Sequence, residues 1–167
     1  TGNISSYQSY LENYFTKLGN KKVNFFTDIS NYLSYECGQP THCYDREKID
    51  NKIIFEEKNL NTEFQTLIGS KISLKGKNCY FAMGDKVINL AGVMGGLSTA
   101  CSEQTKKVIV ECAYFKPASI IGKSLKYNLF TDAAYKFERG VDISSQERTL
   151  RRFISIVQDH VETKSLR

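Results

Sequence analysis

Two short stretches decide the interpretation of this chain: GQPTHCYD at Gly38–Asp45 and TDAAYKFERGVD at Thr131–Asp142. Gly38 and Pro40 break any helix, so the first stretch is expected to form an ordered turn or the start of a strand. The segment Phe130–Gly140, which contains most of the second stretch, is expected to be irregular. Its Thr-Asp pair can form a local turn or cap, and its Glu-Arg pair can be a surface ion pair of little energetic value.

Outward from these stretches, helical periodicity marks the N-terminal part of the chain. Apolar residues recur there at spacings of three and four, which predicts an amphipathic helix with Ser5 or Ser6 as its cap and Gly19 as its end. A second, shorter helix is expected to have Asp28 as its cap or first-turn acid and to end at Gly38. The apolar stripe of the first helix is rich in tyrosine. Such a stripe could stack on bases, but it more often forms core.

The C-terminal part also has helical signals. Pro117 can open a helix that ends near Asn128. A last helix is expected to begin at Ser144, where Glu147 completes a Ser-x-x-Glu capping box. Its buried face is expected to contain Leu150, Phe153, Ile154, Val157 and Val161.

Residues 50–92 contain short apolar runs with turn signals between them, which predicts β-hairpins. The turns are expected at Gly69-Ser70, Gly76-Lys77-Asn78 and Gly84-Asp85. A further strand is expected at 108–113. Helices at both ends and hairpins between them predict an α+β fold, in which helices flank a mixed or antiparallel β core.

Composition sets the limits of the function. The 167 residues are 41% hydrophobic and 25% charged, which suits one globular unit or two fused subdomains. The net charge of +5 permits a polyanionic partner without demonstrating one. The five cysteines form no CxxC pair, so neither a metal site nor a disulfide framework is expected, and a reducing cytoplasm fits. No stretch is apolar and long enough for a membrane span, and no membrane partner is expected.

Single residues suggest a polar pocket but no reaction. No Ser-His-Asp order, Walker loop or HExxH motif is present. The glycine-rich loop Gly92–Gly96 could let a backbone approach a phosphate, or could be a tight turn with positive φ. His42 alone is more often structural than catalytic. Glu111 interrupts an apolar strand, where a carboxylate needs a partner unless it faces solvent.

Four blocks taken together resemble the B3/B4 region of the phenylalanyl-tRNA synthetase β subunit. That region typically has GQPxHxFD, then MGG, then an LLESAYF-like strand, then TDAS-x-RFERGVD. Here the blocks are Gly38–Asp45, Met94–Gly96, Val110–Phe115 and Thr131–Asp142, in the same order and with similar spacing. The resemblance covers nearly the whole chain.

The resemblance implies a B3/B4 editing domain, with 1–167 a fragment of a larger β subunit, as a start at Thr1 without Met also suggests. Such a domain hydrolyses Tyr-tRNA(Phe). The implied parent is a cytoplasmic α2β2 enzyme whose α subunit makes Phe-tRNA with ATP and magnesium. No cofactor is implied for this domain. The implied partners are the 3′ end of tRNA(Phe), the other β-subunit domains and the α subunit.

The resemblance also implies a site. The family's catalytic positions match His42, Glu111 and Thr131, and its substrate-binding positions match Lys21, Gly95, Gly96, Glu111, Thr131 and Ala133. In the family the glutamate recognises the para-hydroxyl of tyrosine, and the histidine lies near the tRNA 3′ end. A site built to bind a hydroxyl rejects the analogue that lacks it by roughly 10⁴-fold or more. Backbone N–H groups near Gly95-Gly96 are candidates to stabilise the oxyanion.

Some positions depart from the family pattern. Lys21 stands where the family has an arginine, and lysine lacks the planar fork that binds anions bidentately. Phe25 stands where the family has a polar asparagine. Two alternatives to an active editing domain therefore stay open. One is a degenerate domain that helps to assemble the β subunit and position tRNA, and the other is a free-standing trans-editing protein.

Overall fold

The computed structural model describes residues 6–166 and divides the chain into two compact units. Unit 1 comprises residues up to Asp45, Cys101–Cys112 and the segment from Ile143 onward. Unit 2 comprises Arg46–Ala100 and Ala113–Asp142. Each unit is therefore assembled from segments that are distant in the sequence, and each is described by itself below.

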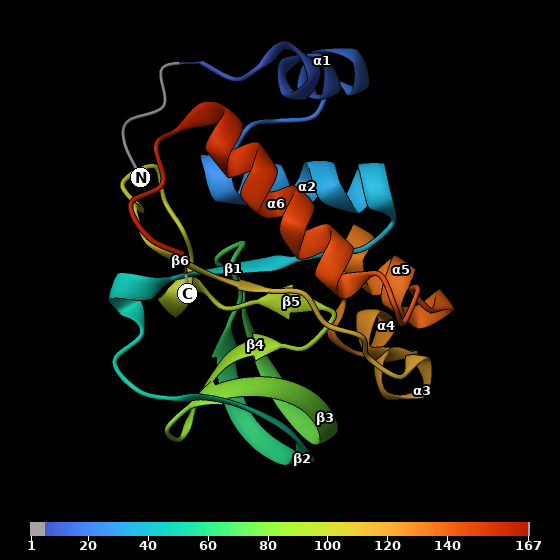
Figure 1. Ribbon diagram of the computed structural model, residues 1–167. Coiled ribbons are helices and arrows are strands. Elements are labelled where there is room, and N and C mark those ends of the chain that lie inside the picture. The colour runs from blue at the N-terminus through green and yellow to red at the C-terminus, as the bar shows by residue number, and fades with distance from the viewer. Residues whose placement is uncertain (1–5, 167) are drawn as a thin grey trace. The chain divides into compact units, whose positions relative to one another are not determined.

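Unit 1 combines three helices with a pair of strands. In chain order it has α1 (Ser9–Leu18), α2 (Phe25–Cys37), β1 (His42–Asp45), β6 (Val108–Glu111) and α6 (Gln146–His160). The two strands pair antiparallel. Helix α2 contacts α1, α6 and β1, and Figure 1 shows α6 crossing α2. Helix α2 thus has a central place in this unit.

The core of unit 1 lies between these helices and the strand pair. Leu11, Ile29, Leu33 and Ile156 are fully buried there, because each lies on the apolar stripe of its helix. The sequence assigned Ile154 to the buried face of α6, whereas Ile156 is the isoleucine that is fully buried. The tyrosines of α1 pack against this core, as the core interpretation of that stripe expected.

The helix ends in unit 1 confirm the stops and correct the starts. Gly19 and Gly38 end α1 and α2 in the left-handed conformation, with φ of 64° and 71°. Helix α1 begins one residue after Gln8, without a side-chain cap, so Ser6 does not cap it. The alternative cap, Ser5, lies outside the described residues. Asn24 caps α2, since its Oδ1 accepts from the N–H of Thr27 at 3.1 Å, and Asp28 is the acid of the first turn, which is the second of the two roles expected for it.

The predicted capping box at the start of α6 is wrong. The N-cap is Ser145, and its side chain makes no capping hydrogen bond. The Ser145 hydroxyl instead donates to Oε1 of Gln39 at 2.9 Å, in the turn before β1. A buried tertiary partner has replaced the local one.

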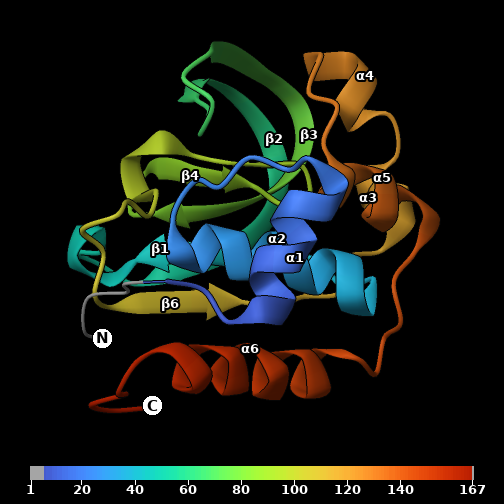
Figure 2. The ribbon, with the colours of Figure 1, turned by 90° about the horizontal axis from the view of Figure 1, so that it is seen from above.

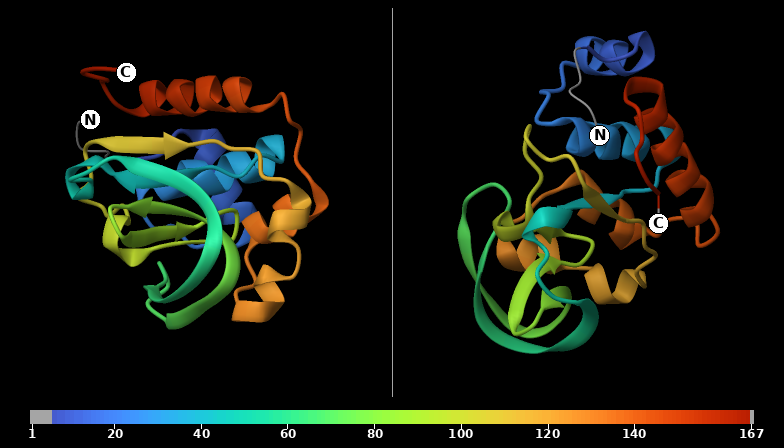
Figure 3. Two further views of the ribbon diagram at one scale, coloured as in Figure 1. Left: turned by 90° about the horizontal axis from the view of Figure 1, so that it is seen from below. Right: turned by 60° about the vertical axis from the view of Figure 1, so that its left-hand side comes forward.

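Unit 2 is built on a four-stranded antiparallel sheet. Its strands β2 (Ile53–Gln65), β3 (Lys71–Met83), β4 (Lys86–Leu90) and β5 (Met94–Gly95) lie in sequential order. Strands β2 and β3 form a long curved ribbon (Figure 3). Short 3₁₀ turns at Arg46–Lys48 and Leu97–Thr99 precede and follow the sheet.

The expected turn at Gly76-Lys77-Asn78 is wrong. Gly76 has a positive φ of 70°, but it lies inside β3 and pairs with Leu60, so the ribbon continues through it. Glycine is read as a turn signal because it permits positive φ, yet here that freedom adjusts a strand. The turns at Gly69 and Gly84 are confirmed. Leu67 and Ile68, one of the short apolar runs that the hairpin interpretation of residues 50–92 treats as strand, belong to the first of these turns.

Three short helices complete unit 2: α3 (Pro117–Ile120), α4 (Lys123–Tyr127) and α5 (Asp132–Arg139). Pro117 opens α3 as expected, but Gly122, with φ of 79°, divides the predicted single helix into α3 and α4. The stretch 130–140 was expected to be irregular and is mostly the helix α5. Figure 2 shows these helices together at one side of the ribbon.

Unit 2 has a core of its own, which the sheet and helices α3 and α5 share. Leu74 of β3, Ile120 of α3 and Ala134 of α5 are fully or almost fully buried in it. Helices packed with antiparallel hairpins confirm the α+β fold class.

Within residues 6–166, no helix is long and apolar enough to cross a membrane.

Candidate functional site

The strand pair of unit 1 brings His42 and Glu111 together. The two residues are directly opposite in the antiparallel register, so their side chains lie on the same face. Cys43 and Val110 form the next pair and point to the other face, where they pack with the core of unit 1. Tyr44, two residues after His42, returns to the face of His42 and Glu111.

Tyr44 is the site residue that the sequence missed. Its phenolic hydroxyl donates to Oε2 of Glu111 at 2.5 Å, across the strand diagonal. Tyr44 is only 2% exposed. Its ring packs edge-on against the ring of His42, with 4.6 Å between the two ring centres. The signal was present in the sequence, because a carboxylate in an apolar strand requires a partner and Tyr44 alternates in phase with His42.

His42 is held as a neutral imidazole. Its Nε2 is buried and has no hydrogen-bond partner among residues 6–166. Burial lowers the pKa of His42 to about 4, because the charged form would lose its hydration. At neutral pH the ring therefore carries no charge, and the nitrogen that lacks a proton can accept a hydrogen bond.

The residues before β1 explain how these strand positions are fixed. Gln39 is 1% exposed, and its Nε2 donates to the carbonyl of Pro40 at 2.9 Å. Its Oε1 accepts from Ser145 at the start of α6. At the other end of β1, the carboxylate of Asp45 accepts from the hydroxyl of Thr105 at 2.7 Å. Both ends of the short strand are thus held by buried polar side chains.

In unit 2, Thr131 joins α5 to the glycine-rich loop. Its Oγ1 accepts from the N–H of Ala134 and so caps α5. The same hydroxyl donates to the carbonyl of Val93 at 2.8 Å. Because a hydroxyl has one hydrogen to donate, Thr131 acts here as a positioning group rather than a proton donor. Ala133, in the first turn of α5, is partly buried against the core of unit 2.

Gly95 and Gly96 are engaged in the sheet. The carbonyl of Gly95 accepts from Leu67, and the N–H of Gly96 donates to the carbonyl of Ile88 at 2.8 Å. A Cβ on Gly96 would lie 2.5 Å from that carbonyl oxygen, so only glycine fits there. The N–H of Gly96 cannot serve an oxyanion while this strand contact exists, which removes it from the predicted oxyanion donors.

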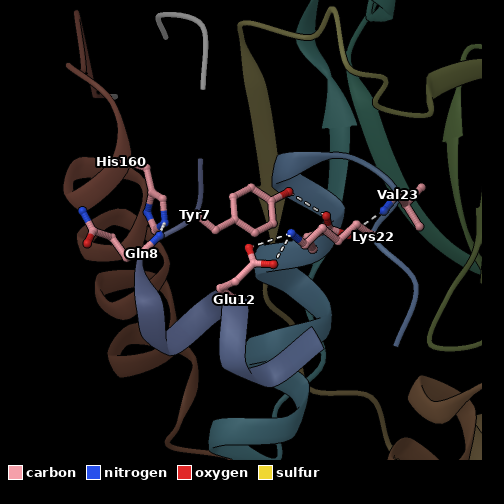
Figure 4. A network of polar contacts seen from close by, with 7 residues as sticks. Tyr7, Gln8, Glu12, Lys22, Val23 and His160 are labelled. Carbon is pink, nitrogen blue, oxygen red and sulfur yellow. Dashed lines mark hydrogen bonds and ion pairs between the residues drawn. The ribbon is translucent and has the colours of Figure 1, made fainter. Parts of the chain in front are cut away.

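The loop between α1 and α2 contains the remaining predicted residue, Lys21, which is exposed. Its neighbour Lys22 is the lysine that forms an ion pair, with Glu12 at 2.6 Å (Figure 4). In the same network the carboxylate of Asp28 accepts from the Tyr7 hydroxyl and from the Val23 N–H. Desolvation raises the pKa of Asp28, and these hydrogen bonds oppose the rise. The network holds the loop without Lys21.

The predicted residues therefore fall into two groups. His42 and Glu111 are joined in unit 1, with Tyr44 added. Thr131 is joined through Val93 to the loop that leads to Gly95 in unit 2. Among the described residues, no three His, Cys, Asp or Glu side chains lie close enough to hold a metal ion.

Comparison with known proteins places this geometry in a family. The model of the B3/4 domain matches residues 2–162. The chain is 33% identical over 150 residues to the phenylalanine–tRNA ligase β subunit of Fusobacterium nucleatum. The aligned residues are 90% of this chain and 19% of that protein. It is 37% identical over 143 residues to the same subunit of Burkholderia pseudomallei. These residues are 86% of this chain and 18% of that protein. The chain thus spans about a fifth of the length of these relatives, and it belongs to the B3/4 domain family.

Proposed function

We propose that this chain is an editing domain that hydrolyses the ester of tyrosine wrongly attached to tRNA(Phe). The proposed setting is a phenylalanyl-tRNA synthetase β subunit, as in the named relatives. In that setting an α subunit partner forms Phe-tRNA with ATP and magnesium, and this domain requires no cofactor. The 3′ end of the tRNA brings the ester to the site.

The contact between Tyr44 and Glu111 is the observation that carries the proposal. A tyrosine side chain already donates its para-hydroxyl to Oε2 of Glu111 at 2.5 Å. The carboxylate is therefore oriented to accept a phenol, which is the group that distinguishes tyrosine from phenylalanine. A substrate hydroxyl would share the carboxylate with Tyr44 or displace it. A charge-assisted hydrogen bond of this kind contributes about 1.5–3 kcal/mol, or roughly 10- to 100-fold in selectivity.

The reaction needs a water molecule placed at the ester carbonyl. The water oxygen attacks the carbonyl carbon, the bond from that carbon to the ribose oxygen breaks, and the ribose oxygen takes the proton. The products are free tyrosine and tRNA. The buried Nε2 of the neutral His42 is suited to orient the water or the ribose hydroxyl. Within unit 2, Thr131 fixes α5 against the loop at Val93.

Deacylation of Tyr-tRNA(Phe) and Phe-tRNA(Phe) by the synthetase that contains this domain tests the proposal. We expect selective hydrolysis of the tyrosyl ester, and loss of that selectivity by 10-fold or more in Glu111→Ala. Glu111→Gln is the matched control for shape, because it keeps the volume and one carbonyl acceptor but removes the charge. It should retain part of the selectivity.

A second outcome would favour the alternative function. If the intact enzyme leaves Tyr-tRNA(Phe) at its uncatalysed rate of hydrolysis, the domain serves assembly and tRNA positioning. The engaged hydroxyl of Thr131 and the engaged N–H of Gly96 agree with that reading. Binding of tRNA without discrimination between the two esters would complete the case for it.

A further inference from the structure

Unit 2 contains a pocket between α4 and α5, and of the residues assigned to the proposed reaction Thr131 lies in its wall. It has a volume of about 570 Å³, enough for a small aromatic ligand. Its wall includes Ser124 and Leu125 of α4, Phe130 of the connecting segment, and Tyr135, Glu138 and Arg139 of α5.

The rim of this pocket is an exposed aromatic surface. Phe130 is 73% exposed, Tyr135 57% and Leu125 77%, in side chains that would ordinarily be buried. The guanidinium carbon of Arg139 lies 3.5 Å from the centre of the Tyr135 ring, and its Nη1 donates to the Tyr135 carbonyl. The stacked Tyr135–Arg139 pair and the Phe130 ring offer flat faces on which a planar ligand can stack.

The inner wall carries hydrogen-bonding groups that lack partners. Ser124 is 8% exposed, and its hydroxyl has no hydrogen-bond partner among residues 6–166. The Oε1 atom of Glu138 is buried and also has no hydrogen-bond partner among these residues. An unpaired buried carboxylate oxygen costs free energy until it accepts a hydrogen bond. A ligand that stacks on the rim and offers N–H donors would satisfy it.

The opposite side of α4 is basic. The ammonium groups of Lys123 and Lys126 donate to backbone carbonyls of β3 at Lys77 and Lys75, respectively. The lysines at 75 and 77 are themselves exposed, so four ammonium groups gather where α4 meets the ribbon. Among them, Lys77 is paired with Glu57. A helix is about 10 Å wide, so these charges lie within one or two nucleotides' reach of the pocket.

We propose that the α4–α5 pocket holds an unpaired base of an RNA strand, while the lysine cluster at Lys75, Lys77, Lys123 and Lys126 takes the adjoining phosphates. Stacking faces beside a positive track are what a single strand requires, whereas a duplex hides its base faces. Glu138 favours bases with an exocyclic amino group, because that group offers two N–H donors, whereas the ring of uracil offers only the N3–H between two carbonyl oxygens. The inference rests on the proposed function, in which an RNA strand carries the ester to this chain.

Binding of a fluorescent single-stranded RNA octamer to the 167-residue chain, followed by anisotropy, tests the inference without any ester. We expect the single strand to bind at least tenfold more tightly than a duplex of the same sequence. Phe130→Ala should weaken single-strand binding by about tenfold. Tyr35→Ala, which removes a 62% exposed tyrosine from α2 in unit 1, is the matched control and should leave binding unchanged. Lys126→Ala should reduce the salt dependence by about 0.7 in log-log slope.

Free nucleosides test the specificity of the pocket itself. Adenosine should compete with the octamer better than uridine, and Glu138→Gln should remove that preference while the chain keeps its thermal stability. Equal binding of single strand and duplex, or wild-type affinity in both Phe130→Ala and Tyr135→Ala, would overturn the inference and leave a nonspecific basic surface. Selective deacylation with unchanged KM in Phe130→Ala would also contradict the proposed role of the pocket, while the editing function would stand. RNA binding at the pocket without deacylation of Tyr-tRNA(Phe) would support the pocket and contradict the editing function.

Discussion

At the scale of single residues, His42 makes stability depend on pH. The pKa of His42 is about 4 in the folded chain and about 6.5 when the chain unfolds. Between these values the unfolded state binds more protons, so stability falls as pH decreases from 6.5 to 4. The contribution of His42 is complete above pH 6.5 and is lost through the acid range.

The corresponding prediction compares His42→Gln with the wild type in urea unfolding at pH 7, 5.5 and 4.5. The wild type should lose on the order of 2–3 kcal/mol more than the variant over this range. Asn61→Gln, at an exposed position of β2 without an ionisable group, is the control for the substitution and should follow the wild-type profile. Parallel profiles for the wild type and His42→Gln would show that His42 titrates normally.

Tyr44 supplies the second prediction at this scale. Tyr44→Phe removes the hydroxyl that donates to Glu111 and should lower the free energy of unfolding by about 1.5–3 kcal/mol. In a Glu111→Gln background the same change should cost less, since the charge-assisted partner is gone. Tyr35→Phe, at an exposed position, provides the control. Additive effects of the two substitutions would mean that the Tyr44–Glu111 contact contributes nothing in solution.

At the scale of elements, the sheet itself requires glycine at position 96. Gly96→Ala would place a Cβ 2.5 Å from the carbonyl oxygen of Ile88, and that backbone cannot retreat without breaking the strand contact. We expect a loss of about 2–3 kcal/mol in thermal or urea unfolding. Ser98→Ala, in the following turn, is the control and should change stability by less than about 1 kcal/mol. Near-wild-type stability of Gly96→Ala would show that the loop adapts.

The elements also show how far local sequence signals reach. The stops at Gly19 and Gly38 were predictable, because a left-handed C-cap is a property of the glycine itself. The start of α6 was not, because Ser145 bonds to Gln39, 106 residues away, and no local pattern reports that partner. Helix α5 was missed for a similar reason. Its stability comes from burying Ala134 and Phe137 in the core of unit 2, rather than from a long periodic run.

At the scale of the whole molecule, the chain passes between the two units after Asp45, Ala100, Cys112 and Asp142. Neither unit is a continuous segment. The sheet of unit 2 lies in 46–100, yet Phe115, Ile120 and Phe137 of the later segment belong to the same hydrophobic core. Each unit therefore needs chain from both sides of an excursion into the other.

From this we expect a peptide of residues 46–100 to be unfolded on its own. Without the helices of 113–142, one face of its sheet would be left without its apolar partners. The amide proton spectrum should show the narrow dispersion of an unfolded chain, while the full chain shows wide dispersion. A peptide that joins 46–100 to 113–142 through a short glycine linker is the matched control and should recover folded signals. A well-dispersed spectrum for 46–100 alone would show that the sheet is self-sufficient.

The sequence by itself determined the α+β class, the glycine helix ends and the membership implied by four blocks in order, since each depends on local propensity or on residue identity. Only the tertiary structure decided the hydrogen-bond partners. The Tyr44 hydroxyl donates to Glu111, the Gly96 N–H donates to the carbonyl of Ile88, and the Thr131 hydroxyl donates to the carbonyl of Val93. These contacts arise from strand register and packing between segments that are far apart in the sequence. Such distances in space are set by the whole fold and not by any one stretch of it.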